Sequence, residues 1–162
     1  MIVLLQKVSN AVDWLITRLV FLLIIALIIV ISLQIVSRIF FSAFSWTEEL
    51  SRYLLVWSTF LGASMAYKRK SHIAVTFAAD LLRGLAKTIT RWIVNLLTVA
   101  FLAVAIYYSV KMISLQVFQV SPALGISMSH VYISLPLGFT AMFIHALSMM
   151  AEELFPGREV RS

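Results

Sequence analysis

The sequence predicts an all-α membrane protein that crosses a bilayer four times. The chain has 162 residues, of which 62% are hydrophobic and 12% charged, whereas soluble domains are near half apolar and a quarter charged. Four apolar stretches are long enough to cross about 30 Å of hydrocarbon as helices. They lack the alternating polarity of lipid-facing β-strands, so we expect helices, arranged in a single membrane domain over residues 1–162.

We place the four spans at residues 14–37, 50–67, 92–110 and 131–150. The apolar run of the first span, Leu19 to Val36, is longer than the core of a signal peptide, and no small-x-small cleavage site follows it. We therefore expect a retained helix. Aromatic side chains near the predicted span ends fit the belts that form at membrane interfaces: Trp14, Trp46, Trp92, Tyr107, Tyr108 and Tyr132.

The basic residues predict the orientation, because Lys and Arg gather in cytoplasmic loops. With the N-terminus in the cytoplasm, ten basic residues fall on the cytoplasmic side and three, Arg38, Arg52 and Lys111, on the other. Both termini are therefore expected in the cytoplasm. The net charge of +6 then reflects loops that face an anionic leaflet, and we expect phospholipid rather than nucleic acid as a partner.

The connection between the second and third spans is predicted to contain an amphipathic helix at about residues 72–90. Apolar residues recur there every four positions, beginning at Ile73 and Phe77, and basic residues fall away from them. This pattern is typical of a helix lying in the membrane interface; the alternative is a cytoplasmic helix packed on another subunit. The residues expected at the membrane surface are Lys68, Arg69, Lys70, His72, Arg83, Lys87 and Arg91.

The densest polar cluster precedes the second span, from Ser45 to Tyr53. Ser45 and Glu48 have the spacing of a capping box, and Glu48 and Arg52 have the spacing of a helical ion pair. The cluster is explained either as a helix start at the outer interface or as a docking site for another subunit. Paired carboxylates for acid–base catalysis are not favoured, because no second catalytic group lies nearby. The docking interpretation assigns partner contacts to Trp46, Glu48, Glu49 and Arg52.

Further along the same span, Ser58, Gly62 and Ala66 are spaced by four. Small residues at this spacing let a second helix approach closely. We assign this face to a partner contact as well, although the partner helix can belong to this chain or to a different protein.

Enzyme chemistry is not expected. The chain has no cysteine, and its three histidines do not have the spacing of metal ligands. We assign no catalytic residue, no metal and no cofactor. His145 lies inside the fourth span, where it is expected to hydrogen-bond a neighbouring helix, although an intramembrane histidine is also a functional candidate. The predicted membrane interior lacks charged residues, which disfavours the alternative of an autonomous small transporter or channel.

The polar cluster and the residues after it resemble a known family, the small membrane subunit (Q component, DctQ-like) of tripartite ATP-independent periplasmic (TRAP) transporters. The resemblance rests on Trp46-Thr47-Glu48-Glu49-Leu50-Ser51-Arg52-Tyr53, Trp57, Phe60-Leu61-Gly62-Ala63, His72-Ile73-x-Val75 and Ser121-Pro122-Ala123-Leu124-Gly125-Ile126. Thr76 stands where the family often has an acid, so a role for that acid is not supported here.

The resemblance implies a multi-pass protein of a bacterial or archaeal cytoplasmic membrane. It implies two protein partners: a large multi-span subunit that carries substrate and sodium, and a periplasmic substrate-binding protein that delivers an organic acid. The small subunit of such a system braces the large one in the membrane. A scaffold without catalytic residues agrees with the absence of charge from the predicted interior.

Overall fold

The computed structural model describes residues 2–40, 44–69 and 85–154. These residues form helices and no strand, which confirms the all-α class for this part of the chain. The elements, in chain order, are α1 (Ile2–Phe40), α2 (Ser45–Lys68), α4 (Leu85–Leu115), α5 (Met128–Tyr132) and α6 (Ser134–Leu154).

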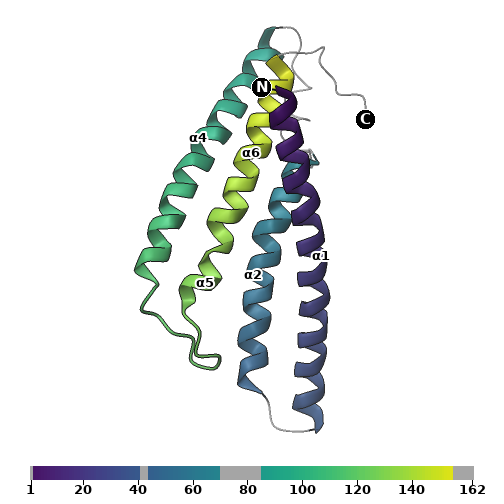
Figure 1. The fold of residues 1–162 in the computed structure, drawn as a ribbon, viewed down its shortest axis with the longest axis vertical. Coiled ribbons are helices and arrows are strands. Elements are labelled where there is room, and N and C mark those ends of the chain that lie inside the picture. The colour runs from purple at the N-terminus through teal and green to yellow at the C-terminus, as the bar shows by residue number, and fades with distance from the viewer. Residues whose placement is uncertain (1, 41–43, 70–84, 155–162) are drawn as a thin grey trace.

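The four long helices lie side by side, and α6 is the central one (Figure 1). It packs against α1, α2 and α4, while α1 and α2 also pack on each other. Within the described residues α4 has no packed contact with α1 or α2. The start of α1 and the end of α6 lie at the same end of the bundle (Figure 1).

Three of these helices are long and apolar enough to cross a membrane: Val3–Phe40, Ala86–Leu115 and Met128–Ala151. They contain the predicted spans 14–37, 92–110 and 131–150. The predicted span 50–67 lies within the continuous helix α2, but α2 is less apolar than the other three and is not among the candidate spans. Polar and charged residues at its start, together with Lys68 at its end, account for this lower apolarity.

The helices extend well beyond the predicted spans. At about 1.5 Å per residue, the 39 residues of α1 reach nearly twice the thickness of the hydrocarbon core. α4 begins at Leu85, so residues 85–90, expected at the end of an interfacial helix, form the first turns of α4. Residues 72–84 of that predicted helix lie outside the described residues.

The fourth predicted span is divided into α5 and α6, with the break at Ile133. Pro136 explains its position: proline has no N–H, and its ring crowds the carbonyl group four residues earlier, that of Tyr132. α5 is capped by Ser127, whose hydroxyl oxygen accepts a hydrogen bond from the N–H of Ser129.

The core lies where α1, α2 and α6 meet. Its buried apolar residues are Ile16, Val20, Leu61 and Ala141, with Trp57 and Met65 among those packed against them. α6 approaches α2 closely at Gly138: a Cβ atom added there would lie 2.8 Å from the carbonyl oxygen of Phe60 and 3.0 Å from its Cβ. The rings of Phe60 and Phe139 meet edge to face beside this contact, with centroids 5.6 Å apart.

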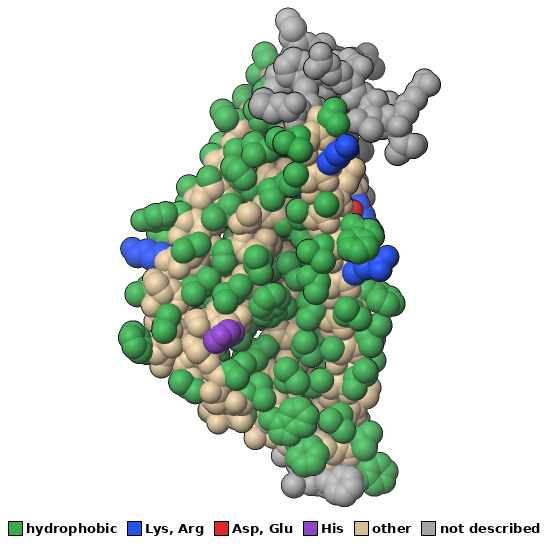
Figure 2. Space-filling model, viewed as in Figure 1, with side chains coloured by type: hydrophobic (Ala, Val, Ile, Leu, Met, Phe, Trp, Pro, Cys, Tyr) green, Lys and Arg blue, Asp and Glu red, His purple; other side chains and the backbone are tan. Residues whose placement is uncertain are grey.

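The outside of the bundle is strongly apolar. Hydrophobic side chains cover most of the face seen in Figure 2. Only 11% of the most apolar stretch of α1 and of α4 is buried within the chain, against 33% for α6. A surface this apolar suits contact with lipid or with another membrane protein rather than with water.

Candidate functional site

The polar side chains of the bundle gather at its two ends. We term the end that contains Glu48 and Glu49 the Glu48 end, and the opposite end the Lys68 end. Each brings together residues that are far apart in the sequence, so the geometry of each is described in turn.

At the Glu48 end, α2 starts without the predicted capping box. Its N-cap is Phe44, which has no side-chain acceptor, and the hydroxyl of Thr47 donates to the Phe44 carbonyl oxygen at 2.7 Å. Ser45 is already the first helical residue. The capping-box prediction for Ser45 and Glu48 is therefore wrong, because the helix begins one residue earlier than that motif requires.

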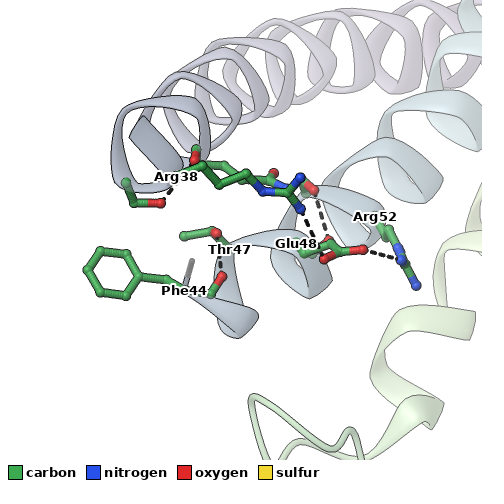
Figure 3. A network of polar contacts seen from close by, with 8 residues as sticks. Arg38, Phe44, Thr47, Glu48 and Arg52 are labelled. Carbon is green, nitrogen blue, oxygen red and sulfur yellow. Dashed lines mark hydrogen bonds and ion pairs between the residues drawn. The ribbon is translucent and has the colours of Figure 1, made fainter. Parts of the chain in front are cut away.

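Glu48 instead binds two arginines (Figure 3). Its Oε1 accepts a hydrogen bond from Arg52 at 2.5 Å, which confirms the predicted pair, and its Oε2 lies 3.6 Å from the guanidinium of Arg38 on α1. The second contact joins the end of α1 to the start of α2. The sequence spacing did not indicate it, because Arg38 and Glu48 belong to different helices. The two arginine side chains are largely exposed and that of Glu48 is about half exposed, so each pair contributes at most about 1 kcal/mol.

Glu49 points to the connection between α4 and α5. Its Oε2 accepts hydrogen bonds from the backbone N–H groups of Ala123, at 3.0 Å, and Leu124, at 2.9 Å. A hydrogen bond from the Ser121 side chain is the largest cause that holds the pKa of Glu49 below its ordinary value of 4.5; the two N–H groups lower it further, and partial desolvation opposes them. Glu49 is thus ionised at neutral pH and fixes this connection to α2.

Replacing Glu49 with glutamine is expected to speed hydrogen exchange at Ala123 and Leu124 several-fold, and E49A should speed it further. Because the pKa of Glu49 is lowered in the folded state, its stabilisation is complete above the ordinary value and is lost as the pH falls through the lowered value. Exchange measured by mass spectrometry at neutral pH tests this expectation. E48Q is the control, since the carboxylate of Glu48 pairs with Arg38 and Arg52; unchanged exchange in E49A would contradict the assignment.

At the Lys68 end, Lys68 connects α2 to α1. Its Nζ donates to the carbonyl oxygen of Ser9 at 2.9 Å and to Oδ1 of Asn10 at 2.8 Å, and it lies 3.8 Å from Oδ2 of Asp13. The neighbouring Arg69 is exposed and reaches the hydroxyl of Thr17 at 3.4 Å. Lys68, predicted at the membrane surface, therefore has well-defined protein contacts.

The other predicted membrane-surface residues are only partly covered by the structure. Lys70, His72 and Arg83 lie outside the described residues, and the side chain of Arg91 is likewise not described. Lys87 is partly buried near the start of α4. Phospholipid contact by this group stays a prediction.

His145 lies beside this cluster and is fully buried. Its Nδ1 is 2.8 Å from the hydroxyl oxygen of Ser9 on α1, which confirms the expected hydrogen bond to a neighbouring helix. Among the described residues, no group hydrogen-bonds to Nε2 of His145 or to the buried hydroxyl of Ser64. The same part of the chain contains no cluster of three or more His, Asp or Glu side chains able to hold a metal ion.

Replacing Ser9 with alanine is expected to destabilise the chain by about 1–3 kcal/mol, because it leaves a buried ring nitrogen without its partner. The double variant S9A/H145L removes the unpaired ring as well and should be more stable than S9A alone. Unfolding of the purified chain by a titration from mild detergent into sodium dodecyl sulfate measures both. An S9A variant as stable as the parent would show that the hydrogen bond contributes nothing.

The predicted partner face of α2, Ser58, Gly62 and Ala66, is termed the Gly62 face. The hydroxyl of Ser58 is bonded within its own helix, to the Leu55 carbonyl oxygen at 2.9 Å. A Cβ atom added at Gly62 would meet nothing within 4 Å, and Ala66 is exposed. The close approach between α6 and α2 occurs at Gly138 instead. Trp46 is likewise exposed and stacks on Phe44, with ring centroids 6.4 Å apart.

Comparisons with known proteins agree on one family. Residues 27–155 match the model of the tripartite ATP-independent periplasmic transporters, DctQ component. The sialic acid TRAP transporter small permease protein SiaQ of Vibrio cholerae is 32% identical over 152 residues, which cover 88% of this chain and 82% of the relative. A putative TRAP transporter small permease protein of Haemophilus influenzae is 28% identical over 137 residues, 82% of this chain and 83% of the relative.

Two longer relatives match over part of their length only. The isethionate TRAP transporter permease protein DctMQ of Oleidesulfovibrio alaskensis is 30% identical over 111 residues, which are 67% of this chain but 18% of that protein. The sialic acid TRAP transporter permease protein SiaT of Haemophilus influenzae is 29% identical over 115 residues, 70% of this chain and 19% of that protein. The chain thus spans less than a fifth of the length of these two relatives.

Proposed function

Because the chain belongs to the DctQ component family of TRAP transporters, and is accordingly a multi-pass inner-membrane protein, we propose that it is the small scaffold subunit of a sodium-coupled TRAP transporter. In this proposal a periplasmic binding protein delivers an organic acid, a large membrane subunit moves it, and this chain braces the large subunit. The chain itself carries out no catalysis.

Two features of the relatives support this assignment. Their names include sialic acid and isethionate, both organic acids, which favours a substrate of that class. The matched region occupies less than a fifth of two longer permeases. This supports a working arrangement in which a chain of this kind lies beside a much larger permease part.

We further propose that α2 is a fourth span and that both termini face the cytoplasm. α2 returns along α1, and the start of α1 and the end of α6 lie at the same end of the bundle (Figure 1), as an even number of crossings requires. Charged residues bound uncharged stretches of similar length on α1 and α2: Arg18 to Arg38 covers about 30 Å and Arg52 to Lys68 about 24 Å. The excess of basic residues at the Lys68 side favours the cytoplasm there.

The proposal that this chain braces the large subunit rests on the Gly62 face, against which no other helix of this chain packs closely at Gly62. Space for a Cβ atom is open at Gly62, and α2 is the least apolar of the long helices. A face of small residues on such a helix suits close packing by another protein helix better than contact with lipid tails. The exposed side chain of Arg52 extends this surface toward the Glu48 end, so the surface offered to the large subunit runs along α2, with the charged start also available to the binding protein. Trp46 is exposed on another side of the helix start.

The alternative, an autonomous small transporter or channel, has less support. The region between α1, α2 and α6 is filled by Ile16, Val20, Leu61 and Ala141. Such a packed apolar core offers an ion or an organic acid no polar path.

Reconstituted uptake tests the proposal. Liposomes that contain the large subunit, the binding protein and this chain should accumulate substrate, and those without this chain should not; full uptake without it would refute the scaffold role. G62L should abolish co-purification with the large subunit while the chain stays folded. The matched control is A103L, on the exposed side of α4, which should leave co-purification unchanged.

A further inference from the structure

The connection between α4 and α5 has apolar side chains on its exposed surface, where a connection in contact with water would carry polar ones. No charged residue occurs from Met112 to Ser129. Exposed apolar side chains follow one another at Leu115, Val117, Phe118, Val120 and Ile126, and Phe118 is 92% exposed. We term residues 116–127 the α4–α5 hairpin. A phenylalanine left this bare in water would be costly, since burying it is worth about 1.5–3 kcal/mol.

The hairpin is held in this shape by specific contacts. Val120 and Ser127 form an antiparallel bridge, and the N–H of Ser121 donates to the Ile126 carbonyl oxygen at 2.8 Å. Gly125 adopts a positive φ of 67° that closes the turn. Glu49 then fixes the tip to α2. The outward display of Phe118 is therefore part of an ordered structure.

The contact with Glu49 also sets the depth of the hairpin. α2 is one continuous helix, so Glu49 lies about 28 Å along it from Lys68. That length is close to the thickness of the hydrocarbon core. If Lys68 marks one boundary of the bilayer, the hairpin lies at the opposite boundary, where headgroups meet acyl chains.

We propose that the α4–α5 hairpin is an interfacial anchor that inserts Phe118 and its apolar neighbours into the lipid leaflet at the Glu48 end. On the exposed side of α4 that leads to the hairpin, Tyr107 and Tyr108 are 65% and 61% exposed. The exposed Lys111 lies between them and the hairpin, and its long side chain can extend its amine to the headgroups. Aromatic residues of this kind sit at the headgroup level of membrane proteins. α4 packs on no long helix other than α6 in the described part of the chain, so lipid can reach hairpin and helix together.

The surface fits lipid better than a water-soluble partner. Beyond the flanking Lys111, it offers no charge to steer or orient a soluble protein, and a partner that leaves after each cycle would return Phe118 to water. The inserted hairpin is fixed to α2 through Glu49. It would therefore resist tilting of the bundle at the Glu48 end. The inference rests on the proposed span α2 but not on the bracing role: uptake that proves independent of this chain would leave it unaffected.

The absence of native cysteine allows a direct depth measurement. F118C and Q119C, each carrying a nitroxide spin label, are compared in the full chain in nanodiscs of phosphatidylethanolamine and phosphatidylglycerol. Gln119 is the polar, exposed neighbour. In power-saturation measurements the label at 118 should be accessible to oxygen and protected from a water-soluble nickel chelate, and the label at 119 should be more accessible to the chelate.

Equal access of the nickel chelate to both labels would overturn the anchor. A label at 118 that is open to the chelate in the chain alone and becomes protected only after the large subunit is added would also overturn it, because the occupant would then be protein. Protection in the chain alone supports the lipid anchor.

Discussion

Alanine in place of Gly138 is expected to lower the stability of the chain, whereas alanine in place of Gly62 is expected to leave it unchanged or raise it slightly. The Cβ atom at position 138 would meet the Phe60 carbonyl oxygen at 2.8 Å and the Phe60 Cβ at 3.0 Å. The carbonyl belongs to the backbone of α2, so relief requires that α6 move away from α2. Overpacking of this kind costs about 1–3 kcal/mol.

The comparison with Gly62 separates packing from helix propensity. Both glycines lie inside helices, so both replacements gain about 0.5–1 kcal/mol from the reduced freedom of the unfolded chain. Of the two, only Gly138 has a neighbouring residue, Phe60, that an added Cβ atom would contact. Unfolding curves of G138A, G62A and the parent in detergent measure the difference, and G138V should be less stable than G138A. Equal stability of G138A and G62A would show that the close approach of α6 to α2 contributes nothing.

These two glycines illustrate what the sequence could predict about the helices. Long apolar runs located α1, α4 and α6, because a run that can fill the hydrocarbon core is readily recognised without knowledge of packing. The spacing around Gly62 indicated a face for close helix packing, yet the chain packs through Gly138. Small residues permit close approach on either helix, so the sequence alone did not tell which glycine contacts a neighbour.

For the polar residues as well, contacts within one helix could be predicted from the sequence, whereas the partners on other elements could not. Glu48 and Arg52 are one helical turn apart, and their pair was predicted correctly. The hydrogen bond that Glu49 accepts from Ala123 of the hairpin and the one between Ser9 and His145 join residues 74 and 136 positions apart, so local patterns could not identify both partners. For His145 the sequence indicated a bond to another helix, since a buried ring nitrogen needs a partner, but it could not identify Ser9.

Methionine in place of Lys68 is expected to destabilise the chain by about 2–3 kcal/mol, because it removes a charged donor from partly buried acceptors. Lys68 and Asp13 are only 20% and 24% exposed. Without Nζ, the carboxylate of Asp13 loses its cation, and the Ser9 carbonyl and Asn10 amide oxygens lose a donor. α1 and α2 are then held at this end mainly by apolar contacts.

A double-mutant cycle isolates the ion pair from the other contacts of Lys68. D13N should cost less than K68M, because the lysine keeps its two neutral acceptors, and K68M/D13N should cost less than the sum of the single changes. The matched control is R69M: Arg69 is adjacent but exposed, so its loss should change stability by less than about 0.5 kcal/mol. Unfolding in mixed detergent micelles measures all four variants. If K68M and R69M have the same small effect, the contacts of Lys68 with α1 do not stabilise the bundle and its role is limited to the membrane surface.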